Sequence, residues 1–356
     1  NLDTFAQSTG VLGPTNASFV FPAVKAKQQS VTSFSFGLQH QLPLAAVLDV
    51  AYVGNVSRHL LQARNLNAIP MYARFDPANM DPTQPGKPLP DDFLRPYLGM
   101  ANLTINEYAG SSNYHSLQTS LQRRFTRNLG FGVSYTWSKA LGVANTYDDG
   151  VSMYFPTKAW EYGRLNFDRA HVFSVNYMYD LPGIGAKLNS KFVGAILDNW
   201  SLSGVTSFSS GAPFTPGFST SYTTDITGST EGARITIVGD PRLSKSEKQF
   251  SRNFVQEAFA LTAVRSFGNA GVNILDGPGI NTWDLSLTKR IPIGLGEGRN
   301  LQFRSEFYNA FNHTQFSGLD STARFDQTGA QVNPNFGAFT ATRSPRVISF
   351  ALRLKF

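Results

Sequence analysis

The chain has 356 residues, of which 15% are charged and 13% aromatic, with a net charge of +7 and no cysteine. The charged fraction is well below the roughly 25% of ordinary soluble domains, and the lack of cysteine excludes disulfides and thiolate metal sites. Lysine and arginine are scattered rather than clustered, which argues against nucleic acid as a partner. No apolar stretch approaches about 18 residues, so no transmembrane helix is predicted.

The first predicted elements are two strands that follow an irregular segment. Residues 1–27 show no periodicity, and because they begin with Asn1 rather than methionine, we expect a processed or truncated product. Residues 31–42 and residues 46–54 each alternate between apolar and polar side chains, with Pro43 between them. A period of two is typical of β-strands. The connection is too short for a helix, so an antiparallel hairpin is predicted.

Short turns and long loops alternate along the rest of the chain. A second hairpin is predicted between residues 115–125 and residues 131–137, and further alternating strands are predicted at residues 173–181, 200–208, 283–287 and 301–311. Smaller elements are a helical segment within residues 187–197, a short strand at 234–238 and a helix-like pattern at 254–264. Long loops, expected to be extracellular, are predicted near residues 62–110, 141–166, 211–280 and 317–345.

The end of the chain carries the clearest strand pattern. One face is apolar and the other becomes basic, since Val347, Ser349, Ala351, Arg353 and Lys355 alternate with Ile348, Phe350, Leu352, Leu354 and Phe356. Its length suits a strand that crosses a bilayer obliquely, which takes about 9–11 residues. With the loop pattern, this predicts an all-β, antiparallel transmembrane β-barrel of the up-and-down type over residues 28–356. A soluble β-sandwich is the alternative, and it predicts solubility without detergent.

Several strings resemble the C-terminal β-barrel region of Oar-like TonB-dependent outer-membrane receptors of the acidobacterial type. They are LDVAYVGN at 48–55, YHSLQ at 114–118, SYTWSK at 134–139, SSGAPF at 209–214 and FRSEFYNAFNH at 303–313, together with Phe356. The resemblance implies the C-terminal part of a roughly 22-stranded barrel with a plug in its lumen. The plug and the TonB-binding region are expected upstream, because no counterpart is visible in this sequence.

The resemblance also implies a function and a location. The protein would import a solute of the siderophore, glycan or peptide class across the outer membrane of a Gram-negative bacterium, with energy supplied by TonB. Its other expected partners are outer-membrane lipid, lipopolysaccharide and the barrel-assembly machinery. A plug-free porin or an adhesin-like barrel with a structural or binding role is the alternative, and a porin would show passive solute conductance.

Two sets of residues are candidates for function. Aromatic side chains on loops stack on sugars or ring-bearing ligands, which makes candidate ligand contacts of Tyr147, Tyr154, Trp160, Tyr162 and Arg164. The alternative is that these side chains pack the loop against the barrel rim. The barrel-assembly machinery is expected to recognise the terminal apolar row of Ile348, Phe350, Leu352, Leu354 and Phe356.

Other constellations do not support a chemical site. No two of the five histidines have the spacing of a local metal site, and residues 148–150 lack the full spacing of a calcium loop. The glycines of residues 294–298 lie between two strand patterns, so they predict a turn rather than a phosphate loop. Because nucleophile and zinc-protease motifs are also missing, no catalytic residue, metal or cofactor is predicted, and the protein is not expected to be an enzyme.

Overall fold

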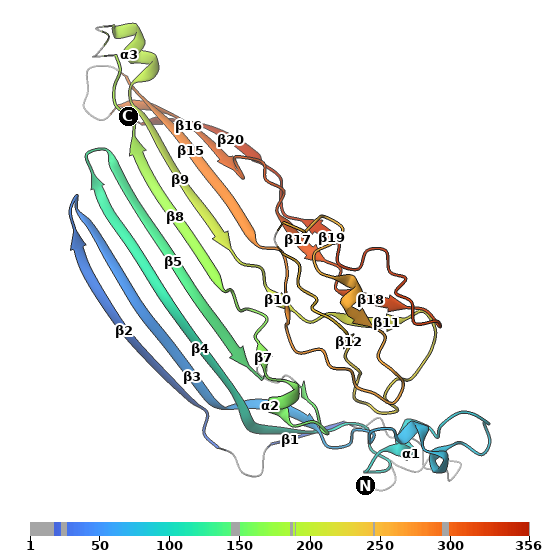
Figure 1. The fold of residues 1–356 in the computed structure, drawn as a ribbon. Coiled ribbons are helices and arrows are strands. Elements are labelled where there is room, and N and C mark those ends of the chain that lie inside the picture. Colours follow the sequence, from blue (N-terminus) through green and yellow to red (C-terminus); the bar gives the residue numbers. More distant parts are fainter. Residues whose placement is uncertain are drawn as a thin grey trace.

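A computed structural model describes residues 18–22, 27–143, 150–185, 188, 190–244, 246–293 and 299–355. Its largest sheet forms a curved wall (Figure 1). Along this wall the long strands follow one another in the order β2 (Ser30–Leu42), β3 (Ala46–Asn65), β4 (Leu103–Thr126), β5 (Leu129–Gly142), β8 (His171–Asp180), β9 (Trp200–Ser209), β15 (Ile280–Pro292), β16 (Asn300–Tyr308) and β20 (Val347–Lys355).

Each neighbouring pair of these long strands is antiparallel, which confirms the predicted all-β, up-and-down architecture. The wall is part of a barrel rather than a closed one. In the part of the chain that the structure describes, β2 and β20 lie at its two edges and do not pair with each other.

The register of the strands gives the wall an apolar face and a polar face. Cross-strand partners share a face, so one row of the polar face runs through Gln39, Asp49, Ser120, Ser134, Ser174, Ser207 and Thr282. A row of the apolar face runs through Phe36, Tyr52, Leu117 and Trp137. Phe36 and Trp137 are 69% and 57% exposed, so the apolar face is not covered by the rest of the described chain.

Short connections lie at one end of the wall. Arg127 and Asn128 join β4 to β5 with φ values of 49° and 66°, as a two-residue turn with both central residues in the left-handed region requires. The predicted turn there is therefore confirmed. The β8–β9 connection contains α3 (Lys191–Leu197), which confirms a helix within the predicted helical segment. The glycine-rich turn predicted at 294–298 lies outside the described residues.

Long loops lie at the other end of the wall, and we name each by the strands it joins (Figure 1). The β3–β4 loop (residues 66–102) contains α1 (Asp91–Leu94) and the 3-10 helices Ala73–Phe75 and Pro77–Asn79. The β5–β8 loop (143–170) contains β6 (Gly150–Val151), α2 (Thr157–Trp160) and β7 (Gly163–Arg164). The described helices include none long and apolar enough to cross a membrane.

The two remaining long loops pack together through short strand pairs. The β9–β15 loop (210–279) contains β10 (Pro213–Phe214), β11 (Gly217–Thr220), β12 (Thr236–Ile237), the 3-10 helix Gln256–Ala258, β13 (Phe259–Ala260) and β14 (Leu275–Asp276). The β16–β20 loop (309–346) contains β17 (Phe316–Leu319), β18 (Thr322–Phe325) and β19 (Phe339–Thr342). Because β11 pairs with β18, the two loops share a small hydrophobic core of Ile235, Phe254, Phe259, Ala270, Leu275, Ala323, Phe325 and Phe336.

Three sequence-based expectations differ from this fold. The strand predicted at 46–54 continues to Asn65, because it extends beyond the apolar band into the loops, where strict alternation is lost. The segment 1–27 contains a strand, β1 (Phe19–Pro22), parallel to β4. The helix-like pattern at 254–264 yields only the short 3-10 helix Gln256–Ala258, because Phe254 and Phe259 on either side of it enter the loop core from irregular or extended backbone. The strand predicted at 234–238 is confirmed as β12.

Candidate functional site

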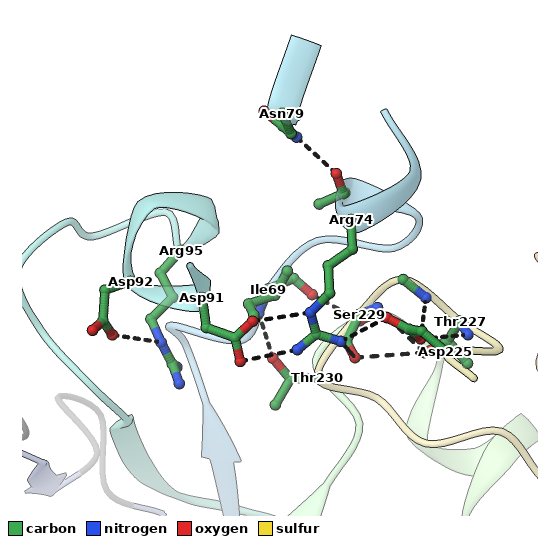
Figure 2. A network of polar contacts seen from close by, with 12 residues as sticks. Ile69, Arg74, Asn79, Asp91, Asp92, Arg95, Asp225, Thr227, Ser229 and Thr230 are labelled. Carbon is green, nitrogen blue, oxygen red and sulfur yellow. Dashed lines mark hydrogen bonds and ion pairs between the residues drawn. The ribbon is translucent and has the colours of Figure 1, made fainter. Parts of the chain in front are cut away.

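Arg74 joins two of the long loops through a network of polar contacts (Figure 2). Its guanidinium donates to both carboxylate oxygens of Asp91, at 2.9 and 3.0 Å, and to Oδ2 of Asp225 at 3.0 Å. It also donates to the carbonyl of Ser229 at 2.8 Å. Burial lowers the pKa of Arg74, but the two carboxylates outweigh this effect and the pKa is raised. The charged guanidinium therefore holds the β3–β4 loop against the β9–β15 loop.

Backbone groups complete this junction. The N–H of Ile69 donates to Oγ1 of Thr230, and the hydroxyl of Ser229 donates to the Ile69 carbonyl, both at 2.7 Å. Ile69 is fully buried and packs with Ala73 and Leu94. Buried backbone groups are stable only when they are hydrogen-bonded. The two loops thus satisfy one another's polar groups and form a single folded unit.

A cavity of about 460 Å³ lies at this junction and is lined by residues of the same two loops. Tyr72, Phe75 and Phe93 contribute aromatic rings, and Asp76 also lines it. The guanidinium of Arg265 lies 5.5 Å from the centre of the Phe75 ring and donates to the Phe75 carbonyl at 3.0 Å. No carboxylate of the described chain lies within ion-pair distance of Arg265. The cavity therefore combines aromatic surface with a positive charge that is not neutralised by an ion pair.

Two residues that line the cavity have strained backbones. Tyr72 and Arg265 each have a φ of 64°, in the left-handed region. Such a conformation costs of the order of 1–3 kcal/mol and persists only where the surroundings impose it. Here the N–H of Tyr72 donates to the Thr227 carbonyl at 3.1 Å, and the N–H of Arg265 donates to the Ile226 carbonyl at 2.7 Å. Because such strain gathers at ligand sites, we take this loop cavity as the candidate functional site.

Sequence reasoning does not single out these cavity residues, because proline dominates the pattern of residues 62–110 and the site forms only when two loops meet. The one local signal is the string from Asp91 to Arg95, where paired charges flank Phe93 and Leu94. A burial pattern cannot be derived from so short a string.

The aromatic residues predicted as ligand contacts lie in the β5–β8 loop, and two of them make extensive contacts within the protein. The ring of Trp160 stacks on Phe155, with 4.2 Å between ring centres, and the Arg234 guanidinium lies 4.0 Å from the Trp160 ring centre. Arg234 forms an ion pair with Glu161 at 3.0 Å. The hydroxyl of Tyr154 donates to a backbone carbonyl of the β3–β4 loop at 2.5 Å. These contacts are those expected of residues that pack the loop.

Burial dominates the electrostatics of this packed region. Burial raises the pKa of the Glu161 carboxyl, and the charge of Arg234 opposes this only in part. Burial also lowers the pKa of Arg234, and it raises the pKa of the Tyr154 hydroxyl with help from the charge of Glu231. The ion pair is thus largely removed from water, which suits a structural contact.

Tyr162 and Arg164 occupy a different position, close to the apolar face. Tyr162 is 36% exposed, and its hydroxyl accepts a hydrogen bond from Asn113 at 2.5 Å. Arg164 forms ion pairs with Asp168 and Asp276 at 2.8 and 2.7 Å. Burial lowers the pKa of Arg164, but the two carboxylates outweigh it and the pKa is raised. Neither residue lines the loop cavity, and Tyr147 lies outside the described residues.

The terminal apolar row is where the sequence places it. Ile348, Phe350, Leu352 and Leu354 alternate along β20 on the apolar face, and their exposed fractions lie between 44% and 68%. Phe356 lies outside the described residues. Strands with one apolar face, open to their surroundings across a whole wall, fit a surface that faces lipid.

A family model described as an outer membrane beta barrel domain matches residues 2–349. The chain belongs to this family. Its membership places the protein in the outer membrane, which confirms the predicted location and the predicted β-barrel. In outer-membrane barrels the apolar face of the wall contacts lipid, long loops are extracellular and short turns are periplasmic, and we expect the same orientation of this chain.

The chain is similar to several solved structures at low sequence identity. The outer membrane transporter YddB from Escherichia coli is 11% identical, with a TM-score of 0.49 over 97% of this chain and 35% of that one. The ferric-catecholate import receptor Fiu from E. coli K12 is 13% identical, with a TM-score of 0.41 over 93% of this chain and 28% of that one. The FrpB iron transporter from Neisseria meningitidis is 11% identical, with a TM-score of 0.42 over 95% and 33%.

The chain spans about a third of the length of these structures. A comparison with curated protein sequences finds no match.

Proposed function

We propose that this barrel domain belongs to a TonB-dependent receptor that binds and imports a solute of the siderophore, glycan or peptide class. The observation that carries the proposal is the folded body of extracellular loops, with its own hydrophobic core and its loop cavity. A passive pore has no need of such a body, whereas a receptor uses structured loops to select its solute. The receptor-like strings of the sequence support the same proposal.

The loop cavity is the proposed first contact for the solute. Its three aromatic rings and the cation of Arg265 favour a solute that carries rings and negative charge, since rings stack on rings and a guanidinium attracts anions. Of the loop residues Tyr147, Tyr154, Trp160, Tyr162 and Arg164, the exposed Tyr162 is the strongest candidate for a second contact. The Tyr154 hydroxyl, the Trp160 ring and the Arg164 guanidinium make packing or ion-pair contacts within the protein.

The two edges of the wall indicate how the transporter is completed. An unpaired strand edge that faces lipid leaves backbone groups without hydrogen bonds, which a bilayer does not tolerate. We therefore infer that β2 and β20 pair with further strands, so that the polar face becomes the wall of a lumen. The same proposal includes a plug and a TonB-binding region outside this sequence, and recognition of the β20 apolar row by the barrel-assembly machinery.

An adhesin-like role is the second candidate. It is favoured by large apolar side chains that the loops expose to water, such as Phe93 at 62%, Tyr97 at 54% and Leu98 at 66%. Exposed apolar residues that lie near one another often mark a protein-binding surface. An adhesin would bind its target without energy and without moving it into the cell.

Uptake by cells that produce the complete protein tests the proposal. The probes are a ferric catecholate complex, a maltodextrin and a short peptide, each radiolabelled, in cells with and without TonB. We expect energy-dependent uptake of one probe, lost without TonB and after collapse of the proton-motive force. Arg265→Gln should weaken binding of that probe, while Arg242→Gln, on an exposed surface, should not. Uptake of small solutes that is indifferent to TonB and to energy would instead establish a passive pore.

A further inference from the structure

The β8–β9 connection carries an exposed apolar surface at the periplasmic end of the wall, opposite the long loops (Figure 1). Leu188, Phe192 and Ile196 are 60%, 76% and 51% exposed, and Ile184 and Leu197 are exposed as well. Several large apolar side chains open to water within so short a segment are costly unless another apolar phase covers them.

Hydrogen bonds and one close backbone contact hold the described residues of this segment. The carboxylate of Asp198 accepts hydrogen bonds from the N–H groups of Ile184 and Gly185, at 2.6 and 2.9 Å. Gly185 lies so close to Gly194 that a Cβ atom on Gly185 would be 2.3 Å from the Gly194 Cα atom. The hydroxyl of Ser190 caps the start of α3 by accepting from Val193. We call the described residues of this segment, 184, 185, 188 and 190–198, the periplasmic hairpin.

Contacts with the strands fix where the hairpin lies relative to the membrane. Trp200 is the first residue of β9 and pairs with Lys289 on the apolar face. Its indole N–H donates to the Ile196 carbonyl at 2.8 Å, and the ammonium of Lys289 donates to the same carbonyl at 3.0 Å and to the Asp198 carbonyl at 2.5 Å. Tryptophan on the apolar face near a strand end marks the membrane–water interface. The last turn of α3 therefore lies at the depth of that interface.

We propose that the periplasmic hairpin is a membrane anchor whose Leu188, Phe192 and Ile196 side chains insert into the phospholipid of the periplasmic leaflet. The apolar surface of the hairpin begins where the lipid-facing surface of the wall ends, at Trp200, so lipid that covers one is in reach of the other. Two carbonyls at the helix end are already hydrogen-bonded, that of Ile196 to Lys289 and Trp200 and that of Asp198 to Lys289. An interfacial segment of this kind needs bound polar groups and free apolar side chains.

Site-directed spin labelling tests the anchor. The present sequence has no cysteine, and any cysteine elsewhere in the complete protein is first replaced by serine so that the introduced one is unique. The complete protein, with Phe192→Cys or Ile196→Cys, is labelled and reconstituted in vesicles of phosphatidylethanolamine and phosphatidylglycerol. Leu352→Cys on β20 serves as the lipid-exposed reference, and Lys87→Cys in the β3–β4 loop serves as the water-exposed reference. Collisions of each label with oxygen, which partitions into lipid, and with a water-soluble nickel chelate are then measured.

We expect the oxygen-to-nickel collision ratio at Phe192→Cys and Ile196→Cys to rise above that of Lys87→Cys, toward that of Leu352→Cys. If insertion into lipid causes the rise, removing a neighbouring apolar side chain should reduce it. Phe192→Ser combined with Ile196→Cys should therefore lower the oxygen-to-nickel ratio in the same vesicles. A ratio equal to that of Lys87→Cys would overturn the anchor. Protection from both reagents would also overturn it, because that result means that a second copy or another protein covers the hairpin.

The test is independent of the proposed transport. The anchor rests on the outer-membrane location of the barrel and on the hairpin itself, and a plug-free pore would carry it equally well.

Discussion

Tyr72 and Arg265 belong to different long loops, yet both have a left-handed backbone whose N–H donates to a neighbouring carbonyl, that of Thr227 or Ile226. Both then line one cavity. Two strained residues fixed by one short segment make the cavity sensitive to any shift of that segment. The loops that enclose the cavity must therefore be held rigidly, and the stability of the loop body becomes a condition for binding.

The first prediction concerns Arg74, which clamps the two loops. Arg74→Ala should lower the free energy of local opening of the β3–β4 and β9–β15 loops by about 1–3 kcal/mol, because charge-assisted hydrogen bonds are lost at a partly buried junction. Hydrogen exchange of peptides from both loops measures this opening. Arg74→Lys should recover only part of the protection, since an ammonium cannot bind Asp91 through two parallel bonds.

The matched control for this clamp is Arg242→Ala. Arg242 and Asp240 form an ion pair at 3.7 Å, with side chains 77% and 71% exposed, and such pairs contribute little. Exchange in Arg242→Ala should match the wild type. If Arg74→Ala leaves both loops as protected as the control does, the clamp does not hold them together.

The second prediction concerns the core of the loop body. Phe254 is 1% exposed and packs edge-on against Phe336 and Phe259, with 4.9 and 5.6 Å between ring centres. Phe254→Ala should destabilise this body by about 3–5 kcal/mol. Faster proteolysis of the loops, with an intact and heat-modifiable barrel, is the expected readout. Val238→Ala, at a side chain 64% exposed, should leave the proteolysis rate unchanged.

The barrel wall could be predicted from the sequence because its determinants are local. One strand such as β20 shows its two faces by alternation alone, and the type of turn at Arg127 and Asn128 follows from its length. The loop body could not be predicted, because its core joins Phe254 to Phe336 and its clamp joins Arg74 to Asp225. Contacts between distant residues leave no periodic trace, so the loop cavity was beyond the reach of the same reasoning.

The predicted ligand contacts show the same limit for single residues. An aromatic side chain on a loop has the same sequence signature whether it meets a ligand or a neighbouring loop. Trp160 is bound by Phe155 and Arg234, which only the fold brings to it. The exposed face of the terminal row from Ile348 to Leu354, by contrast, can be predicted from the alternation within the strand itself.

The third prediction is a pH dependence at the turn after β18. The carboxylate of Asp326 accepts hydrogen bonds from the Thr328 hydroxyl at 2.7 Å and from the N–H groups of Thr328 and Ala330. The bond from the Thr328 hydroxyl is the main cause that holds the pKa of Asp326 below its usual 3.8. A lowered pKa means that the folded turn binds the proton more weakly than the unfolded chain does. Its contribution is therefore present above 3.8 and is lost as the pH falls through the lowered value.

Pepsin cleavage and hydrogen exchange at acidic pH measure this loss in residues 326–330. In the wild type this turn should stay protected at pH values near 3.8, the usual pKa of the Asp326 carboxyl, and open only at lower pH. In Thr328→Val the turn should open at a higher pH than in the wild type. Asp326→Ala should lack the dependence altogether. An acid transition in this turn that is the same in all three proteins would show that the carboxylate does not control it.

The fourth prediction compares neighbouring positions on β20 that face opposite sides of the wall. Phe350 is 68% exposed on the apolar face, and Ser349 lies on the polar face opposite Glu306. Phe350→Arg should destabilise the barrel by about 2–4 kcal/mol near the middle of the bilayer, because the charge must enter lipid. Ser349→Arg should cost much less, because its guanidinium meets the polar face and the carboxylate of Glu306. Urea unfolding in phospholipid vesicles measures the free energy of unfolding of both variants. Equal decreases in the two variants would mean that the lipid-facing and polar faces of the wall have been wrongly assigned.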